Sequence, residues 1–132
     1  MSLCPCHSQK LYDDCCQPQH LSSQPCPNAL ALMRSRYAAY ALRNANYLIS
    51  TCHPNNPHYQ INHNDWRETI LQFSCAKEFR GLQILEFIDG DERATVTFKA
   101  ILFQNGKDVS FTEKSRFVKE KGKWFYLDGV KT

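Results

Sequence analysis

Apolar residues recur at steps of three and four in the first half of the chain and at every second position in the last third. Between Asn28 and Ser50 this spacing predicts one long amphipathic helix with Asn28 as its N-cap. A second, shorter helix is predicted after Asp65, because Asp65 and Glu68 form a capping-box pattern, and Gly81 is expected near its end. The helical signal is therefore confined to the first part of the chain.

From residue 82 onward the alternation of apolar and polar residues is typical of β-strands. The turn signals Asp89-Gly90-Asp91, Asn105-Gly106 and Lys121-Gly122 separate strands expected at 82–88, 94–103, 109–118 and 123–130. Helices followed by a meander of long strands predict an α+β fold, in which helices pack on the concave side of a curved antiparallel sheet. Such a cone is either filled by side chains or open as a ligand pocket.

The length of 132 residues suits one domain with a small appendage. The polar, proline-rich stretch 17–27 is expected to be a linker between an N-terminal unit, residues 1–20, and the α+β domain, residues 28–132. The first unit has too few apolar residues to fold unaided, so it needs a metal or a crosslink. With no 18-residue apolar run and no signal-peptide profile, we expect a cytoplasmic protein that does not enter the membrane.

Four of the seven cysteines lie near the N-terminus, as two close pairs: Cys4, Cys6, Cys15 and Cys16. Two thiol pairs joined by a short loop can converge on one tetrahedral zinc ion. Disulfides are rare in a reducing compartment, and cysteines this close in sequence bridge each other poorly, so zinc is the better explanation. Four sulfurs leave no open coordination position, which favours a structural role. His7 and His20 are the alternative ligands.

The predicted cone carries a set of candidate pocket residues: Trp66, Phe111, Glu113, Trp124 and Tyr126. Glu113 shares a strand face with apolar residues, so a desolvated carboxylate is expected there, able to act as an acid or base. The alternatives are an ion pair between Glu113 and Arg34 or Arg36, or simple exposure of Glu113 at the rim of the cone. The aromatic residues have an alternative too, as ordinary core.

The remaining histidines and cysteines give weaker signals. A shared metal site is one interpretation of His53, His58 and His63, and solvated loop histidines are the other. Cys52 and Cys75 are expected to be small buried hydrophobes, and Cys26 an isolated thiol in the linker.

The N-terminal pattern Cys-Pro-Cys, Ser8-Gln9-Lys10 and Tyr12-x-x-Cys-Cys resembles the SEC-C motif of the SecA translocation motor. In that motif the cysteines bind zinc, and the knuckle docks protein and ribosome partners. The resemblance therefore implies zinc at the four cysteines and a protein partner for the knuckle. The motif usually has glycines beside the serine, where this chain has His7 and Gln9.

A broader resemblance covers almost the whole chain. The segments 34–41 (RSRYAAYA), 47–48, 51–54 (TCHP) and 123–129 (KWFYLDG) are similar to those of the YchJ-like family of bacterial proteins. Its members join a SEC-C motif to a cone-shaped, cystatin-like domain similar to nuclear transport factor 2. The resemblance implies the same two-part architecture here.

Three functions fit these patterns. The leading hypothesis is a non-enzymatic zinc-binding protein, whose knuckle docks a protein and whose cone supports homodimerisation or binds a small ligand. The second is an enzyme of the isomerase, dehydratase or hydrolase kind with Glu113 as acid or base. The third is a nucleic-acid or ribosome-associated adaptor that uses the knuckle and a basic group: Lys114, Arg116, Lys119, Lys121 and Lys123. Charge weakens this third hypothesis, because four thiolates and one Zn²⁺ together lower the formal net charge from +3 to +1 and so remove most of the apparent basicity.

Overall fold

The computed structural model describes residues 2–132 of the chain. Within them the helical elements are a short 3₁₀ turn, η1, and four α-helices: η1 (Tyr12–Asp14), α1 (Gln17–His20), α2 (Ala29–Ala41), α3 (Ala45–Ser50) and α4 (His63–Ala76). The strands follow them in the chain: β1 (Glu78–Ile88), β2 (Arg93–Gln104), β3 (Lys107–Asp108), β4 (Phe111–Glu120) and β5 (Lys123–Lys131). None of these helices is long and apolar enough to cross a membrane.

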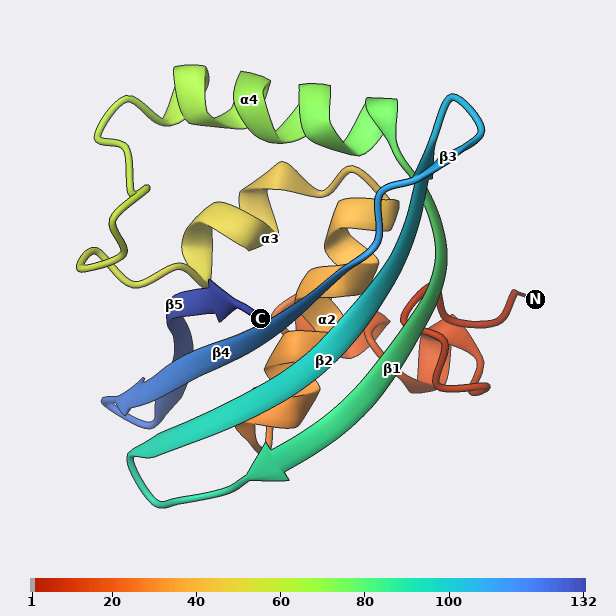
Figure 1. Cartoon of the computed structure of the whole chain (residues 1–132). Helices are drawn as coiled ribbons and strands as arrows, with labels where there is room; N and C mark the ends of the chain where they lie inside the picture. Colours follow the sequence, from red (N-terminus) through yellow and green to blue (C-terminus); the bar gives the residue numbers. More distant parts are fainter. Residues whose placement is uncertain (1) are drawn as a thin grey trace.

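The strands form one antiparallel sheet in the order β1-β2-β4-β5, and the short β3 pairs with β2. The sheet curves strongly, and α2, α3 and α4 lie on its concave side (Figure 1). The predicted α+β cone is therefore confirmed. At Asn105 and Gly106 the backbone takes φ of 53° and 78°, the left-handed conformation that tight hairpin turns require. This explains why the Asn-Gly pair marked the turn correctly.

The helix predicted from Asn28 to Ser50 is two helices. Asn28 caps α2 as expected, accepting a hydrogen bond from the Ala31 amide at 2.8 Å. The chain then leaves the helix at Arg43, where φ is +60°. Asn44 caps α3 by accepting from the Tyr47 amide at 3.2 Å. An apolar period that runs through both helices hides this break, because the period does not report on capping.

The capping box predicted at Asp65 and Glu68 is wrong. Helix α4 begins at His63, three residues earlier than predicted, and its cap is Asn62, which accepts from the Asp65 amide at 3.1 Å. Gly81 does not end the helix either. It lies within β1, where its carbonyl accepts a hydrogen bond from the Tyr37 hydroxyl at 2.8 Å.

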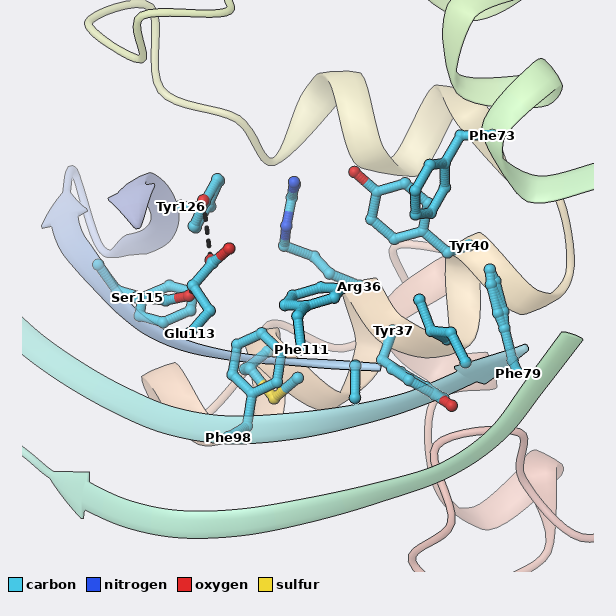
Figure 2. A pocket seen from close by; sticks show the side chains of 14 residues that line it. Arg36, Tyr37, Tyr40, Phe73, Phe79, Phe98, Phe111, Glu113, Ser115 and Tyr126 are labelled. Carbon is cyan, nitrogen blue, oxygen red and sulfur yellow. Dashed lines mark hydrogen bonds between the residues drawn. The ribbon is translucent and has the colours of Figure 1, made fainter. Parts of the chain in front are cut away.

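One face of β2 forms the centre of the core. Its residues Val96, Phe98, Ala100 and Leu102 are all buried, as the alternating pattern predicted. They pack with α2 and with the large buried side chains of the last strands, among them Phe117. This core fills the deep part of the cone, and a cavity remains between it and the helices (Figure 2).

Candidate functional site

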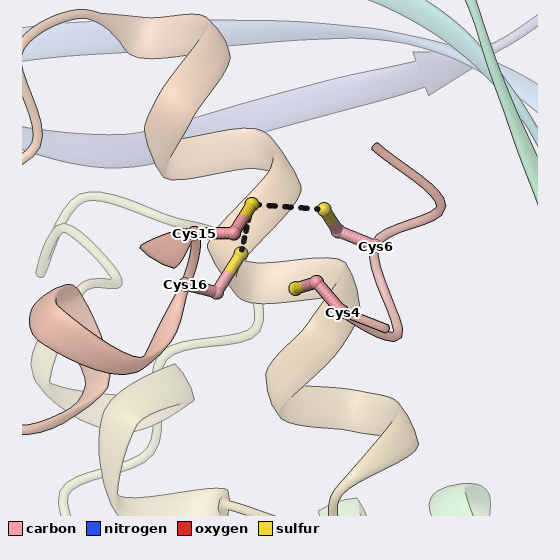
Figure 3. Close-up of side chains that lie close together, drawn as sticks. All are labelled: Cys4, Cys6, Cys15 and Cys16. Carbon is pink, nitrogen blue, oxygen red and sulfur yellow. Dashed lines mark hydrogen bonds between the residues drawn. The ribbon is translucent and has the colours of Figure 1, made fainter. Parts of the chain in front are cut away.

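The four N-terminal cysteines converge on one point (Figure 3). Their sulfur atoms all lie within 4.8 Å of one another, with 3.5 Å between Cys6 and Cys15 and 3.8 Å between Cys15 and Cys16. Sulfurs placed about 2.3 Å from a tetrahedral zinc ion are roughly 3.8 Å apart. The cluster therefore has the size of a four-sulfur metal site before any ion is added.

A tight loop brings the two cysteine pairs together. The Cys4 amide donates to the Lys10 carbonyl at 2.8 Å, and the His7 amide donates to the Cys4 carbonyl at 3.1 Å. His7 and Gln9 adopt φ of 63° and 73°. These are the positions where the SEC-C motif usually has glycine, and a left-handed backbone is what glycine accommodates without strain. The loop thus takes the left-handed backbone at both positions with non-glycine residues.

The cluster packs on helix α2. Ala38 is fully buried beside the cysteines, and Nη1 of Arg34 donates to the Cys6 carbonyl at 3.0 Å and lies 4.0 Å from the Cys6 sulfur. The predicted linker also takes part, since it forms α1 and places His20 against α2. Residues 2–20 are consequently packed against α2 rather than attached to it by a flexible tether.

Neither alternative histidine belongs to the cluster. Nε2 of His20 donates to the Ser35 carbonyl at 2.7 Å, because a carbonyl only accepts, and Nδ1 then accepts from the Tyr12 hydroxyl at 2.7 Å. Both ring nitrogens of His20 are therefore occupied. The ring of His7 packs edge-on against Tyr37, with 5.7 Å between the ring centres.

The crowded thiols perturb one another. Hydrogen bonds from Cys16 and then Cys4 lower the pKa of Cys6, while hydrogen bonds to Cys4 and then Cys6 raise the pKa of Cys16. Without a cation these shifts favour the thiolate on Cys6 and the protonated thiol on Cys16. A divalent metal displaces those protons when it binds, so metal affinity must rise with pH.

The second site is the cavity in the cone, with a volume of about 150 Å³. Its apolar wall consists mainly of aromatic rings from α2, α4 and the sheet, and Figure 2 shows them around the opening: Tyr37, Tyr40, Phe73, Phe79, Phe98 and Phe111. An engineered apolar cavity of similar volume holds a benzene molecule. The space is therefore large enough for a single-ring ligand.

One side of the cavity is polar. Oε2 of Glu113 accepts hydrogen bonds from the Ser115 hydroxyl at 2.6 Å and from the Tyr126 hydroxyl at 3.1 Å. The guanidinium of Arg36 lies over the Tyr126 ring, 4.7 Å from its centre. Burial, reinforced by the negative charge of Glu113, raises the pKa of Tyr126, so its hydroxyl stays protonated and donates.

The predicted ion pair between Glu113 and an arginine does not form. No carboxylate oxygen among residues 2–132 lies within 4.0 Å of a nitrogen of Arg34 or Arg36. Nη1 of Arg36 instead donates to the Leu48 carbonyl at 2.9 Å and to the Thr51 hydroxyl at 2.7 Å. Opposite charges therefore share the cavity wall without neutralising each other.

The structure brings together three of the five predicted pocket residues. Phe111, Glu113 and Tyr126 line the cavity, whereas Trp66 and Trp124 are buried elsewhere in the core. Trp66 packs against Tyr59 with 4.9 Å between ring centres. The binding role of the first three stays a prediction.

Helix α2 supplies four cavity residues that are not among the predicted pocket residues: Met33, Arg36, Tyr37 and Tyr40. Their spacing of three and four was the available signal.

The weaker predictions have mixed outcomes. His53 is buried, with Nε2 2.9 Å from Glu120, whereas His58 and His63 are exposed and do not join it. Cys52 is buried as expected, but Cys75 is exposed on α4. Cys26 is not isolated, since its sulfur lies 3.5 Å from the Tyr47 hydroxyl.

The basic group is spread over β4 and its hairpin with β5. Arg116 makes a bidentate pair with Asp128, which compensates its charge. Lys119 lies over the Trp124 ring at 5.9 Å. Nucleic-acid binding by this group stays a prediction.

The segments that carried the family resemblance meet around the cavity. Tyr126, from the KWFYLDG segment, donates its amide to the Thr51 carbonyl and accepts from the His53 amide, both at 2.8 Å. Arg36, from the RSRYAAYA segment, bonds the Thr51 hydroxyl.

The sequence profile described as "YchJ, middle NTF2-like domain" matches residues 28–129. The chain belongs to the YchJ family. A YchJ protein of Shigella dysenteriae serotype 1 is 36% identical over 131 residues, which are 98% of this chain and 83% of that protein. The family's architecture is an NTF2-like cone, and here a SEC-C cysteine cluster precedes it.

Two solved structures extend this YchJ-family comparison to the whole fold. The solution structure of a SEC-C motif containing protein from Rhodopseudomonas palustris is 32% identical, covers 98% of both chains and superposes with a TM-score of 0.85. The crystal structure of a SEC-C motif containing protein from Psychrobacter arcticus is 27% identical, with 98% of this chain and 82% of that chain covered and a TM-score of 0.77. The knuckle and the cone are thus arranged similarly in these proteins.

Proposed function

We propose that this YchJ-family protein binds a small organic ligand in its cone, and that a zinc ion held by Cys4, Cys6, Cys15 and Cys16 orders the knuckle against α2. The observation that carries the proposal is the cavity of about 150 Å³, which is walled by aromatic rings and has Arg36 and Glu113 on one side. Ligand sites in proteins combine such apolar walls with a few polar groups that fix orientation.

Helix α2 links the two parts of this proposal. Ser35 and Ala38 on one face support the knuckle, while Arg36 and Tyr40 on the other face line the cavity. A zinc ion with four sulfur ligands has no open coordination position, so its role here is structural rather than catalytic. By fastening the knuckle it holds α2 in place, and α2 in turn forms one wall of the binding site.

The test is binding of a simple apolar probe. Toluene, added to the zinc-loaded protein, is expected to shift the NMR signals of Phe98 and Phe111, which line the cavity. Phe98→Trp fills part of this space and should abolish the toluene-dependent shift of Phe111, while the remaining spectrum stays dispersed. Absence of any toluene-dependent shift in the wild-type protein contradicts the proposal.

Acid–base catalysis by Glu113 is the second candidate function. Its support is that Ser115 and Tyr126 hold one carboxylate oxygen, Oε2, and leave the other without a hydrogen bond among residues 2–132. Glu113→Gln should then abolish turnover of the bound compound, while toluene, which makes no hydrogen bond to Glu113, still binds. A protein partner for the knuckle and homodimerisation through the cone stay predictions.

A further inference from the structure

The polar side of the cavity contains one cation and one anion that do not pair. Nη1 of Arg36 donates hydrogen bonds to the Leu48 carbonyl and the Thr51 hydroxyl at the end of α3. No carboxylate oxygen among residues 2–132 lies within 4.0 Å of an Arg36 nitrogen. Glu113 is held through Oε2 alone. Figure 2 shows both side chains on the wall with Tyr126 beside them. Each retains capacity for a further hydrogen bond.

Building on the proposed function, we propose that the ligand is a neutral, flat, single-ring compound with a hydrogen-bond donor and acceptor side by side, as in a carboxamide or a ring lactam. The acceptor takes a hydrogen bond from Arg36, and the donor gives one to Oε1 of Glu113. The ring lies among the aromatic side chains. The polar and aromatic groups of the cavity wall specify this chemical class and no particular compound.

Charge balance favours a neutral head group. A carboxylate ligand would pair with Arg36 but would lie beside the like-charged Glu113 carboxylate. An ammonium ligand would pair with Glu113 but would lie beside the like-charged Arg36. Like charges at such range in a partly desolvated site oppose binding. A head group that hydrogen-bonds to both residues avoids either conflict and gives each half-buried charge one further partner.

The third charge near the opening does not alter this balance. Lys131 is exposed, and its ammonium nitrogen lies over the Phe111 ring, 4.6 Å from the ring centre. Solvent and salt screen an exposed ammonium strongly. Arg36 and Glu113, both half-buried, therefore dominate the field that a bound head group experiences.

Gly129 sets the position of Glu113. A Cβ placed on Gly129 would collide with the Glu113 carboxylate, 2.6 Å from its carboxyl carbon, and with the Tyr126 hydroxyl at 2.9 Å. The carboxylate is the mobile end of its side chain, so Gly129→Ala should move it at little cost in stability. This substitution changes the location of the anion without changing its charge.

The experiment compares four probes of similar size that differ only in the head group: toluene, benzamide, benzoate and benzylamine. Chemical-shift titration of the zinc-loaded protein gives each Kd, expected on the order of 1 mM for molecules this small. Benzamide should bind about tenfold more tightly than the others, since hydrogen bonds to charged groups contribute that much or more.

Two variants identify the residues responsible. Glu113→Gln should weaken benzamide severalfold and strengthen benzoate, because the repelling carboxylate is gone. Gly129→Ala should remove the benzamide preference while toluene still binds. The control is Glu86→Gln, which makes the same charge change at an exposed position of β1 and should leave all four affinities unchanged.

The outcomes separate the inference from the proposal beneath it. Toluene binding with no head-group preference, or with benzoate or benzylamine preferred, overturns the neutral-ligand inference and leaves a small-ligand site in place. Failure of all four probes to bind overturns the ligand-binding function itself.

Discussion

Arg34 offers a direct way to probe the charge of the cysteine cluster. A zinc ion with four thiolates carries two net negative charges, and the Arg34 guanidinium is fixed beside it by a 3.0 Å hydrogen bond to the Cys6 carbonyl. The same nitrogen lies 4.0 Å from the Cys6 sulfur. Arg34→Gln removes this cation and keeps the helix, since both residues are good helix formers.

Two estimates of the effect agree. A hydrogen bond to a charged group contributes about 1.5–3 kcal/mol, or roughly 10- to 150-fold in an equilibrium constant. Substituting groups that orient metal ligands typically lowers metal affinity 10- to 100-fold. Arg34 is half-exposed, and 4.0 Å is a long contact to sulfur, so the effect should lie near the lower end. We expect zinc affinity to fall about tenfold.

The assay is competition for zinc with a chromogenic chelator at neutral pH. Arg43→Gln is the matched control, because Arg43 is an exposed arginine just after α2 and changes the net charge equally. Arg34→Lys should fall between the two, since it keeps the charge and loses the planar donor geometry. Equal zinc affinities for Arg34→Gln and Arg43→Gln would refute the electrostatic reasoning.

Three further predictions concern the knuckle and the helices that lie beneath it. Burial lowers the pKa of His20 from its usual value of 6.5. As the pH drops below that value, the unfolded chain takes up a proton that the folded chain does not, so the free energy of unfolding should fall. His20→Gln should flatten this pH dependence in urea titrations, and His58→Gln, the control, should not. Ser35, fully buried, bonds the Tyr47 hydroxyl at 2.6 Å, so Ser35→Ala should destabilise by about 1–3 kcal/mol and Tyr47→Phe by less; strictly additive effects in the double variant would contradict this coupling. Gln9→Gly should stabilise the zinc-loaded protein by about 0.5–1 kcal/mol, because φ at this exposed position is +73°, and a lower melting temperature would show that the left-handed backbone carries no strain.

The sheet and the cysteine cluster were predictable because their signals are local. Alternation along β2 reports directly which face is buried, and the Asn-Gly turn fixes where the hairpin reverses. The cysteines lie close in sequence, so a short loop is enough to bring their sulfurs together. Each of these features depends on residues within a few positions of one another.

The cavity was only partly predictable because it depends on how distant elements meet. Glu113 was singled out from its strand face, but its partner Tyr126 reaches it across the β4–β5 pairing, and Arg36 comes from a helix far away in sequence. The two tryptophans were included for their chemistry alone, and packing took them into the core. His20 was placed in a linker because nothing nearby in the sequence shows its contact with Ser35.

X-ray absorption at the zinc edge tests the central claim, that the four sulfurs hold one zinc ion and so order the knuckle on α2. The account predicts one zinc per chain in protein purified without chelators, with four sulfur neighbours at about 2.3 Å and no nitrogen or oxygen ligand. A spectrum dominated by nitrogen or oxygen neighbours, or reduced protein that takes up no zinc, would contradict it.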